Sequence, residues 1–236
     1  MRLPNLRPDL APLRDSRDLR LVALGGFVSG LGSQATLVAL PYQVYVQTHS
    51  AVRVGVLGLV ELLPLVAASL LGGAVADRID RRALLLLDQM GLVLTAAGLA
   101  VAAWLGHAPL AVIYVLAGLL AAFTALQSVT VSAIVPRLVA PAQLRSALAL
   151  EYGLSTLAMV AGPAFGGILI AALGLQWAYA IDAVSCAAMV LAVAAMAPQP
   201  PVQVGPHEPL GRSIAEGLRY VRSNQALLGS IQSPES

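Results

Sequence analysis

Six long apolar runs, separated by short polar stretches, dominate the sequence. Each run reaches the about 20 predominantly apolar residues that a helix needs to cross a bilayer. The alternation of apolar and polar residues over roughly ten positions that is typical of β-barrel strands is absent from these runs. The pattern therefore predicts an all-α membrane protein with six transmembrane helices, at residues 21–46, 54–76, 83–105, 109–135, 146–174 and 176–197.

The composition agrees with a bilayer as the solvent. The chain is 58% hydrophobic and 11% charged, with a mean hydropathy of +0.81, whereas about 25% of the residues in soluble domains are charged. The single cysteine, Cys186, and three scattered histidines show no spacing typical of metal ligands. A nucleotide-binding loop and a catalytic triad are also missing from the sequence. We therefore expect no cofactor, no metal and no enzymatic activity.

The placement of the basic residues, all fourteen of which are arginines, predicts the sidedness of the helices. Thirteen fall before the first run, after the second, between the fourth and fifth, or after the sixth, and only Arg53 falls on the opposite side. Because short loops rich in arginine stay in the cytoplasm, we expect a cytoplasmic N-terminus. The net charge of +2 belongs to these loops and gives no reason to expect a nucleic-acid partner.

The polar stretches divide the chain into four segments. Residues 1–20 are expected to form a cytoplasmic N-terminal segment, and residues 21–197 the six-helix bundle. Residues 198–226 begin with a proline-rich break and continue as a cytoplasmic linker with a short amphipathic helix. Residues 227–236 are interpreted as the truncated start of a seventh helix, because their apolar stretch ends after Ile231.

The loop after the second run holds five charged residues in the six positions 77–82. The positive-inside rule explains its arginines but not its two aspartates. The spacing Gly-x-x-x-Asp-Arg-x-x-Arg-Arg resembles the loop signature of the major facilitator superfamily of secondary transporters, with an aspartate in place of the usual glycine before the arginine pair. The form Asp-Arg-x-Asp-Arg-Arg is similar to the enterobactin-exporter-like branch. The resemblance implies that this loop helps to latch two transporter halves together, through Gly73, Asp77, Arg78, Asp80, Arg81 and Arg82.

A second motif lies in the run 146–174. Gly162 and Gly166 have the spacing of closely packed membrane helices, and Pro163 removes a backbone hydrogen-bond donor. Ordinary packing explains these residues. The core Gly-Pro-x-x-Gly-Gly, which also includes Gly167, resembles the antiporter signature of exporters in the same superfamily.

The resemblance covers roughly residues 14–231 and matches the N-terminal half of such a transporter. It implies two inverted three-helix repeats in a bacterial-type inner membrane. It also implies export of small siderophore- or drug-like molecules by alternating access, with protons as a candidate coupling ion. A second six-helix half is then required, either a missing C-terminal half, if the chain is truncated, or a homodimer partner. The alternative function is a non-transporting membrane scaffold or regulatory protein.

Polar residues inside the apolar runs are the candidates for binding protons or solute, because a charge at the bilayer centre is costly. Glu61 and Asp182 are the acidic candidates. A carboxyl group that burial keeps neutral, or that lies near enough to the interface to stay hydrated, explains Glu61 equally well, and structural anchoring is the other interpretation of Asp182. Interhelical hydrogen bonding explains the uncharged candidates equally well; these are Gln34 and Thr36 in the first run and Thr124, Gln127, Ser128 and Thr130 in the fourth.

Other residues near the ends of the runs have simpler interpretations. Asp88 is expected to join the charge network of the loop at 77–82, and Glu151 is expected to pair with Arg145 or Arg137. Aromatic side chains at the predicted outer ends are interpreted as interfacial anchors; these are Trp104, Trp177 and Tyr179.

Overall fold

The computed structural model describes residues 10–76, 79–106 and 108–200. Six helices in this part of the chain are long and apolar enough to cross a membrane, which confirms the predicted all-α membrane fold. Their bounds agree with the predicted runs to within a few residues: α2 (Arg17–Thr48), α3 (Ala51–Ala76), α4 (Arg81–Leu105), α5 (Leu110–Ile134), α6 (Leu144–Leu173) and α7 (Leu175–Ala194). Three short elements accompany them: α1 (Ala11–Asp15), η1 (Val135–Arg137) and η2 (Pro141–Gln143).

Local sequence signals determine where several helices begin. The Ser16 hydroxyl accepts a hydrogen bond from the backbone N–H of Leu19 and caps α2. The Asp80 carboxylate caps α4 in the same way, through the backbone N–H groups of Arg82 and Ala83. Between α6 and α7 a single residue, Gly174, turns the chain at a φ of 96°, a conformation that glycine adopts without steric cost.

The helix packing divides the bundle into two equivalent repeats, α2–α4 and α5–α7. Helix α2 packs against α6 and α7, while α5 packs against α3 and α4. Helices α4 and α7 pack against each other, and α2 touches α5 only slightly. Exchanging the two repeats reproduces these main contacts, although α6 also touches α7 and α2 also touches α3. Because each repeat has three membrane-crossing helices, the second starts on the opposite side of the bilayer from the first, as the prediction of inverted repeats requires.

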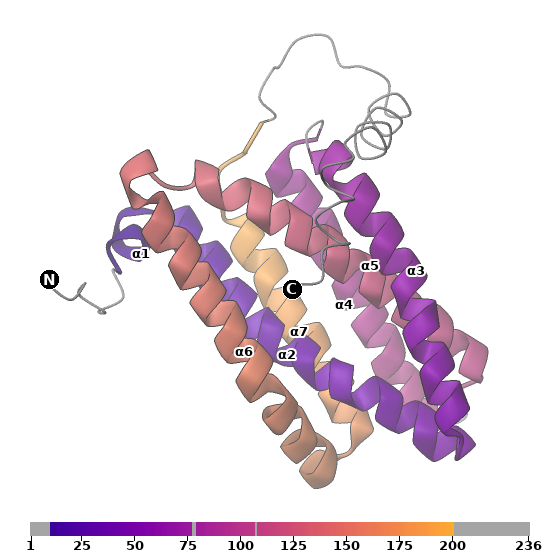
Figure 1. The fold of residues 1–236 in the computed structure, drawn as a ribbon. Helices are drawn as coiled ribbons and strands as arrows, with labels where there is room; N and C mark the ends of the chain where they lie inside the picture. Colours follow the sequence, from indigo (N-terminus) through magenta and orange to yellow (C-terminus); the bar gives the residue numbers. More distant parts are fainter. Residues whose placement is uncertain (1–9, 77–78, 107, 201–236) are drawn as a thin grey trace, which may run out of the picture. The chain divides into compact units, whose positions relative to one another are not determined.

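Figure 1 shows α6 beside α2 and α3 beside α5. The apolar core lies in two clusters where α2, α4, α5 and α7 meet; one includes Leu40, Leu99 and Ile113, and the other Leu85, Ile134 and Met189. In the apolar window of α4, 56% of the residues are buried, whereas in that of α3 only 6% are. Helix α3 thus leaves most of its apolar surface available to lipid or to another protein.

Part of the predicted organisation cannot be compared with these helices. The amphipathic helix predicted within 198–226 and the apolar stretch at 227–236 lie outside the described residues, as do Asp77 and Arg78 of the loop signature. Gly73 lies in the last turns of α3.

Candidate functional site

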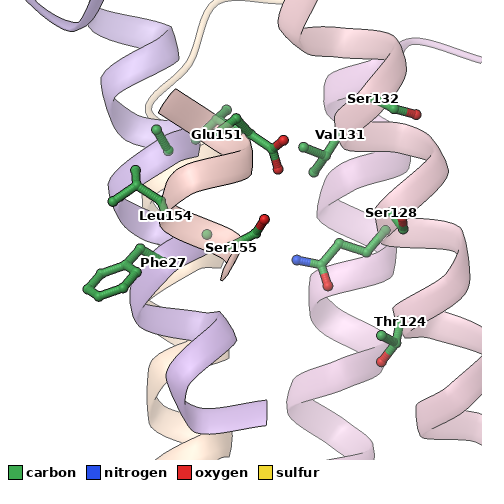
Figure 2. Close-up of a pocket in the computed structure, with 12 residues that line it drawn as sticks. Phe27, Thr124, Ser128, Val131, Ser132, Glu151, Leu154 and Ser155 are labelled. Atoms are coloured by element: carbon green, nitrogen blue, oxygen red, sulfur yellow. The ribbon is translucent and has the colours of Figure 1, made fainter. Parts of the chain in front are cut away.

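A pocket of about 380 Å³ lies between α2, α5 and α6. Helix α5 contributes most of its polar wall, and α2 contributes an apolar wall that includes Phe27. Figure 2 shows the Glu151 carboxylate and the Ser155 hydroxyl pointing from α6 toward α5. The complete lining consists of Val22, Ala23, Gly26, Phe27, Thr124, Gln127, Ser128, Val131, Ser132, Glu151, Leu154 and Ser155.

The polar wall follows from the sequence of α5. Thr124, Ser128 and Ser132 recur every four residues, a spacing that places side chains on one helix face. All three are exposed, and Gln127 lies beside them half-buried. Residues 110–134 contain no charged side chain, so the helix inserts easily despite this row of hydroxyls. The Ser132 hydroxyl donates to the backbone carbonyl of Val129 at 2.8 Å. A row of polar side chains on a membrane-spanning helix is nevertheless better suited to an aqueous path or to a second protein surface than to lipid.

Glu151 is the one charged residue in the lining. The predicted ion pair with Arg145 or Arg137 is not formed within the described residues; Arg137 instead donates a hydrogen bond to the backbone carbonyl of Pro200 at 2.8 Å. The Glu151 carboxylate therefore faces the pocket and forms no ion pair with an arginine of the described residues.

The motif in α6 brings that helix against α2. A Cβ on Gly162 would collide with the side chain of Gln34, and one on Gly166 would lie 2.6 Å from the Cα of Ala35. A Cβ on the neighbouring Gly167 would meet no atom within 4 Å. Two of the motif's three glycines thus allow the α2–α6 contact that forms one wall of the pocket. Gln34 packs in that contact and is not part of the lining.

Comparison with known proteins shows the family to which the chain belongs. The model of the family described as "Transmembrane secretion effector" matches residues 8–231. The chain belongs to this family of the major facilitator superfamily. Similar proteins include the enterobactin exporter EntS of Shigella boydii serotype 18 and of Escherichia coli O127:H6, each 30% identical over 229 residues. That alignment covers 94% of this chain and 55% of the relative.

The enterobactin exporter EntS of Citrobacter koseri is also 30% identical, over 224 residues that make up 94% of this chain and 53% of the relative. This member of the transmembrane secretion effector family thus spans about half the length of the curated relatives it matches. The family is one of membrane transporters rather than of enzymes.

In this family member Asp182 lies outside the pocket, completely buried where α7 packs on α2. Its carboxylate accepts hydrogen bonds from Ser33 at 3.0 Å, from Thr36 at 2.6 Å and from the Cys186 thiol at 3.5 Å. A Cβ on Gly32 would collide with the Ser185 hydroxyl and lie 2.9 Å from the Cα of Asp182, so the two helices approach closely here. The geometry agrees with structural anchoring, the second interpretation of Asp182.

The prediction that Asp88 joins the charge network of the loop is wrong. Asp88 lies two turns inside α4, completely buried against α5, and one of its oxygens is 2.9 Å from the Thr130 hydroxyl. The loop residues Asp80 and Arg82 bind elsewhere. Helix α4 begins at Arg81, so Asp88 has already entered the bundle, and the periodicity of the helix turns it toward α5.

The described part of the loop signature joins the start of α4 to the end of α7. Arg82 donates to the backbone carbonyls of Val193 and Ala194 in the last turn of α7, where a cation is favoured by the helix dipole. Asp80 accepts from the backbone N–H of Gln199 at 3.1 Å, and the backbone N–H of Arg81 donates to the carbonyl of the same residue. Asp80, which replaces the usual glycine, thus holds the chain that follows α7.

The structure treats the three aromatic residues predicted as interfacial anchors differently. Tyr179 is not an interfacial anchor: it is completely buried, and its hydroxyl donates to the side-chain oxygen of Gln43 at 2.7 Å. Trp104 and Trp177 are exposed and form an edge-to-face pair. Glu61 lies on α3, half-buried and outside the lining of the pocket, and its role stays a prediction.

Sequence reasoning identified Gln127 and its neighbours Thr124 and Ser128 but missed Ser132 and Ser155. The four-residue spacing of hydroxyls on α5 was the available signal for Ser132. The described residues contain no group of three acidic, histidine or cysteine side chains that could hold a metal ion.

Proposed function

We propose that this chain is the N-terminal six-helix half of a secondary-active exporter in a bacterial inner membrane. The pocket between α2, α5 and α6 is part of the solute path in this proposal. The observation that carries it is the row of exposed hydroxyls at Thr124, Ser128 and Ser132, which shares the pocket with Glu151. Polar side chains within membrane-spanning helices usually face the bundle interior or a water-filled cavity, which supports contact of this surface with water, solute or protein.

The proposed mechanism is alternating access between two six-helix halves. The second half covers the pocket and is supplied either by a C-terminal half or by a second copy of this chain. With the N-terminus in the cytoplasm, the loop of Asp80, Arg81 and Arg82 also lies there. The names of the relatives, which are enterobactin exporters, support small siderophore- or drug-like solutes as the class transported here.

Flux measurements in proteoliposomes test this function. The chain would be reconstituted alone, and in parallel with the C-terminal six-helix half of the Escherichia coli relative. Enterobactin and ethidium would serve as probes under an imposed proton gradient. We expect Ser128→Leu, which places a bulky side chain in the pocket, to lower the flux of a transported probe about tenfold or more. Val115→Leu is the matched control, since it changes an exposed position of the same helix outside the lining.

Each result has a defined meaning. Flux by the chain alone supports a homodimer, and flux only with the added half supports a two-segment transporter. Equal flux in wild type and Ser128→Leu would remove the pocket from the path. If neither preparation moves either probe while the chain inserts and retains its fold, a non-transporting scaffold is the better description.

A further inference from the structure

The two repeats carry an aspartate and a threonine in the same places. Asp182 follows Asp88 by 94 residues, and Thr130 follows Thr36 by the same 94 residues. Asp88 of α4 meets Thr130 of α5, and Asp182 of α7 meets Thr36 of α2. In both cases the third helix of one repeat is tied to the first helix of the other. Equivalent positions in the fold thus hold two buried carboxyl groups, which can be compared atom by atom.

Asp182 is surrounded as an ionised carboxylate should be. An ionised carboxylate only accepts hydrogen bonds. Ser33 and the Cys186 thiol share one of its oxygens, at 3.0 and 3.5 Å, and Thr36 donates to the other at 2.6 Å. Thus both oxygens have a donor. The neighbouring helices supply the hydrogen bonds that a buried charge requires.

Asp88 has no comparable set of donors. Its single hydroxyl neighbour, Thr130, lies 2.9 Å from Oδ2 of Asp88 and 2.8 Å from the backbone carbonyl of Leu126. A threonine hydroxyl has one proton to donate. If that proton serves the carbonyl of Leu126, which cannot itself donate, the proton between Thr130 and Asp88 must come from the carboxyl group. The other oxygen, Oδ1, is buried with no hydrogen-bond partner among the described residues.

Within the described residues no cation is hydrogen-bonded to Asp88, since Oδ1 has no partner and Oδ2 meets Thr130. Helix α5 has no charged residue between Leu110 and Ile134. On α7 the titratable groups are Tyr179, Cys186 and Asp182, and all of them are hydrogen-bonded to α2. On α4 itself the guanidinium of Arg82 is bound to the carbonyls at the end of α7. Arg81, two turns before Asp88, also lies at the start of α4.

From this geometry we propose that Asp88 is a proton-binding site: it holds a proton and donates it in a hydrogen bond to Thr130, while Asp182 stays ionised. Loss of that proton leaves a buried charge with at most one donor, the Thr130 hydroxyl, and with none at Oδ1, so it favours a looser α4–α5 contact. Helix α5 carries the pocket residues Gln127 and Val131 beside Thr130. Proton release at Asp88 is therefore coupled to the pocket. This coupling rests on the proposed transport function, but the protonation of Asp88 is independent of that function.

Infrared spectroscopy of the purified chain in lipid nanodiscs tests the proton directly. A protonated carboxyl has a C=O stretching band that carboxylates lack, and the band shifts in heavy water. We expect Asp88→Asn to remove one such band at neutral pH. The matched variant Asp182→Asn, at the equivalent position of the other repeat, should leave it unchanged. A spectrum that Asp88→Asn does not alter, or a band lost in Asp182→Asn instead, would overturn the proposal.

A second pair of variants covers the case in which Asp88→Asn fails to insert. Thr130→Val removes the acceptor of the Asp88 proton, so the band should remain and move to higher frequency. Thr36→Val should leave it in place, and a Thr130→Val spectrum identical to wild type would reject the assignment. Because the measurement involves no transport, its failure and the failure of the proposed function are distinguishable. Flux without the band rejects the proton site, and the band without flux, whether or not the second half is added, rejects the exporter.

Discussion

The α2–α7 contact and the α4–α5 contact occupy equivalent places in the two repeats, yet they are built differently. At the first, Asp182 has donors on both oxygens, and Gly32 lets the helices approach closely. At the second, Asp88 meets one hydroxyl, and the neighbouring Gln89 is buried with neither amide atom hydrogen-bonded among the described residues. The symmetry of the fold thus determines where each carboxyl group lies, but not how many hydrogen-bond donors surround it. The α2–α7 contact, in which both oxygens of Asp182 have donors, is suited to stay packed. The α4–α5 contact, in which one oxygen of Asp88 has none, is suited to rearrange.

The largest expected difference between the two contacts is in the cost of neutralising each aspartate. Asp182→Asn replaces an acceptor oxygen by an N–H₂ group that faces hydroxyl donors, and buried groups left unpaired in this way cost about 3 kcal/mol at the upper end. Asp88→Asn resembles the protonated acid already present, so we expect a loss of less than about 1 kcal/mol. Reversible unfolding in detergent, followed by circular dichroism, measures both. Equal losses would show that the two carboxyl groups are in the same state.

The sequence predicts the six helices well because apolar length alone decides whether a segment crosses a bilayer. It does not show which side of each helix meets which neighbour. It therefore predicts Asp88 in the loop network and Tyr179 at the membrane interface, although both are completely buried. The 94-residue relation between Asp88 and Asp182 is present in the sequence. It acquires meaning only once α4 is known to pack on α5, and α7 on α2.

The candidate site was predicted only in part for the same reason. Gln127 could be selected because it is polar inside an apolar run, and it does line the pocket. The sequence predicts an ion pair for Glu151 because arginines lie close to it along the chain. In the fold its carboxylate points across the pocket instead (Figure 2). Sequence distance gives no information on which of two neighbours a side chain faces.

An intermediate effect is expected from adding a methyl group at each contact. A Cβ on Gly32 would meet the backbone of Asp182 at 2.9 Å, so α2 and α7 must move apart, and we expect Gly32→Ala to cost about 2 kcal/mol. A Cβ on Gly91 of α4 would meet the ring of Phe123 on α5 at 2.5 Å. That half-buried ring can rotate away, so Gly91→Ala should cost clearly less.

Gly26→Ala is the control for these two variants, because a Cβ there would meet no atom within 4 Å. Alanine is the better helix former, so this variant should be neutral or slightly stabilising. The same unfolding measurement serves for all three. If Gly91→Ala costs as much as Gly32→Ala, the α4–α5 contact is as rigid as the α2–α7 contact, and the proposed difference between them disappears.

The smallest expected effect concerns Ser33 and Gln127, which are also 94 residues apart. Ser33 donates to Asp182 on α7, whereas Gln127 lines the pocket and has no hydrogen bond to Asp88 on α4. Ser33→Ala removes one of three donors to Asp182, and single interhelical hydrogen bonds in membranes contribute about 0.6 kcal/mol on average. Gln127→Ala should leave the unfolding free energy unchanged and weaken the binding of a transported probe.

Measuring both quantities for both variants gives four results, of which two should change. A loss of stability in Gln127→Ala would mean that this side chain also ties helices together, as Ser33 does. A loss of probe binding in Ser33→Ala would mean that the α2–α7 contact reaches the pocket. Either result would contradict the expected difference between the repeats, in which Ser33 stabilises helix packing and Gln127 binds solute. The expected pattern, in which each variant changes one property, would show that the second repeat uses for solute a position that the first repeat uses for packing.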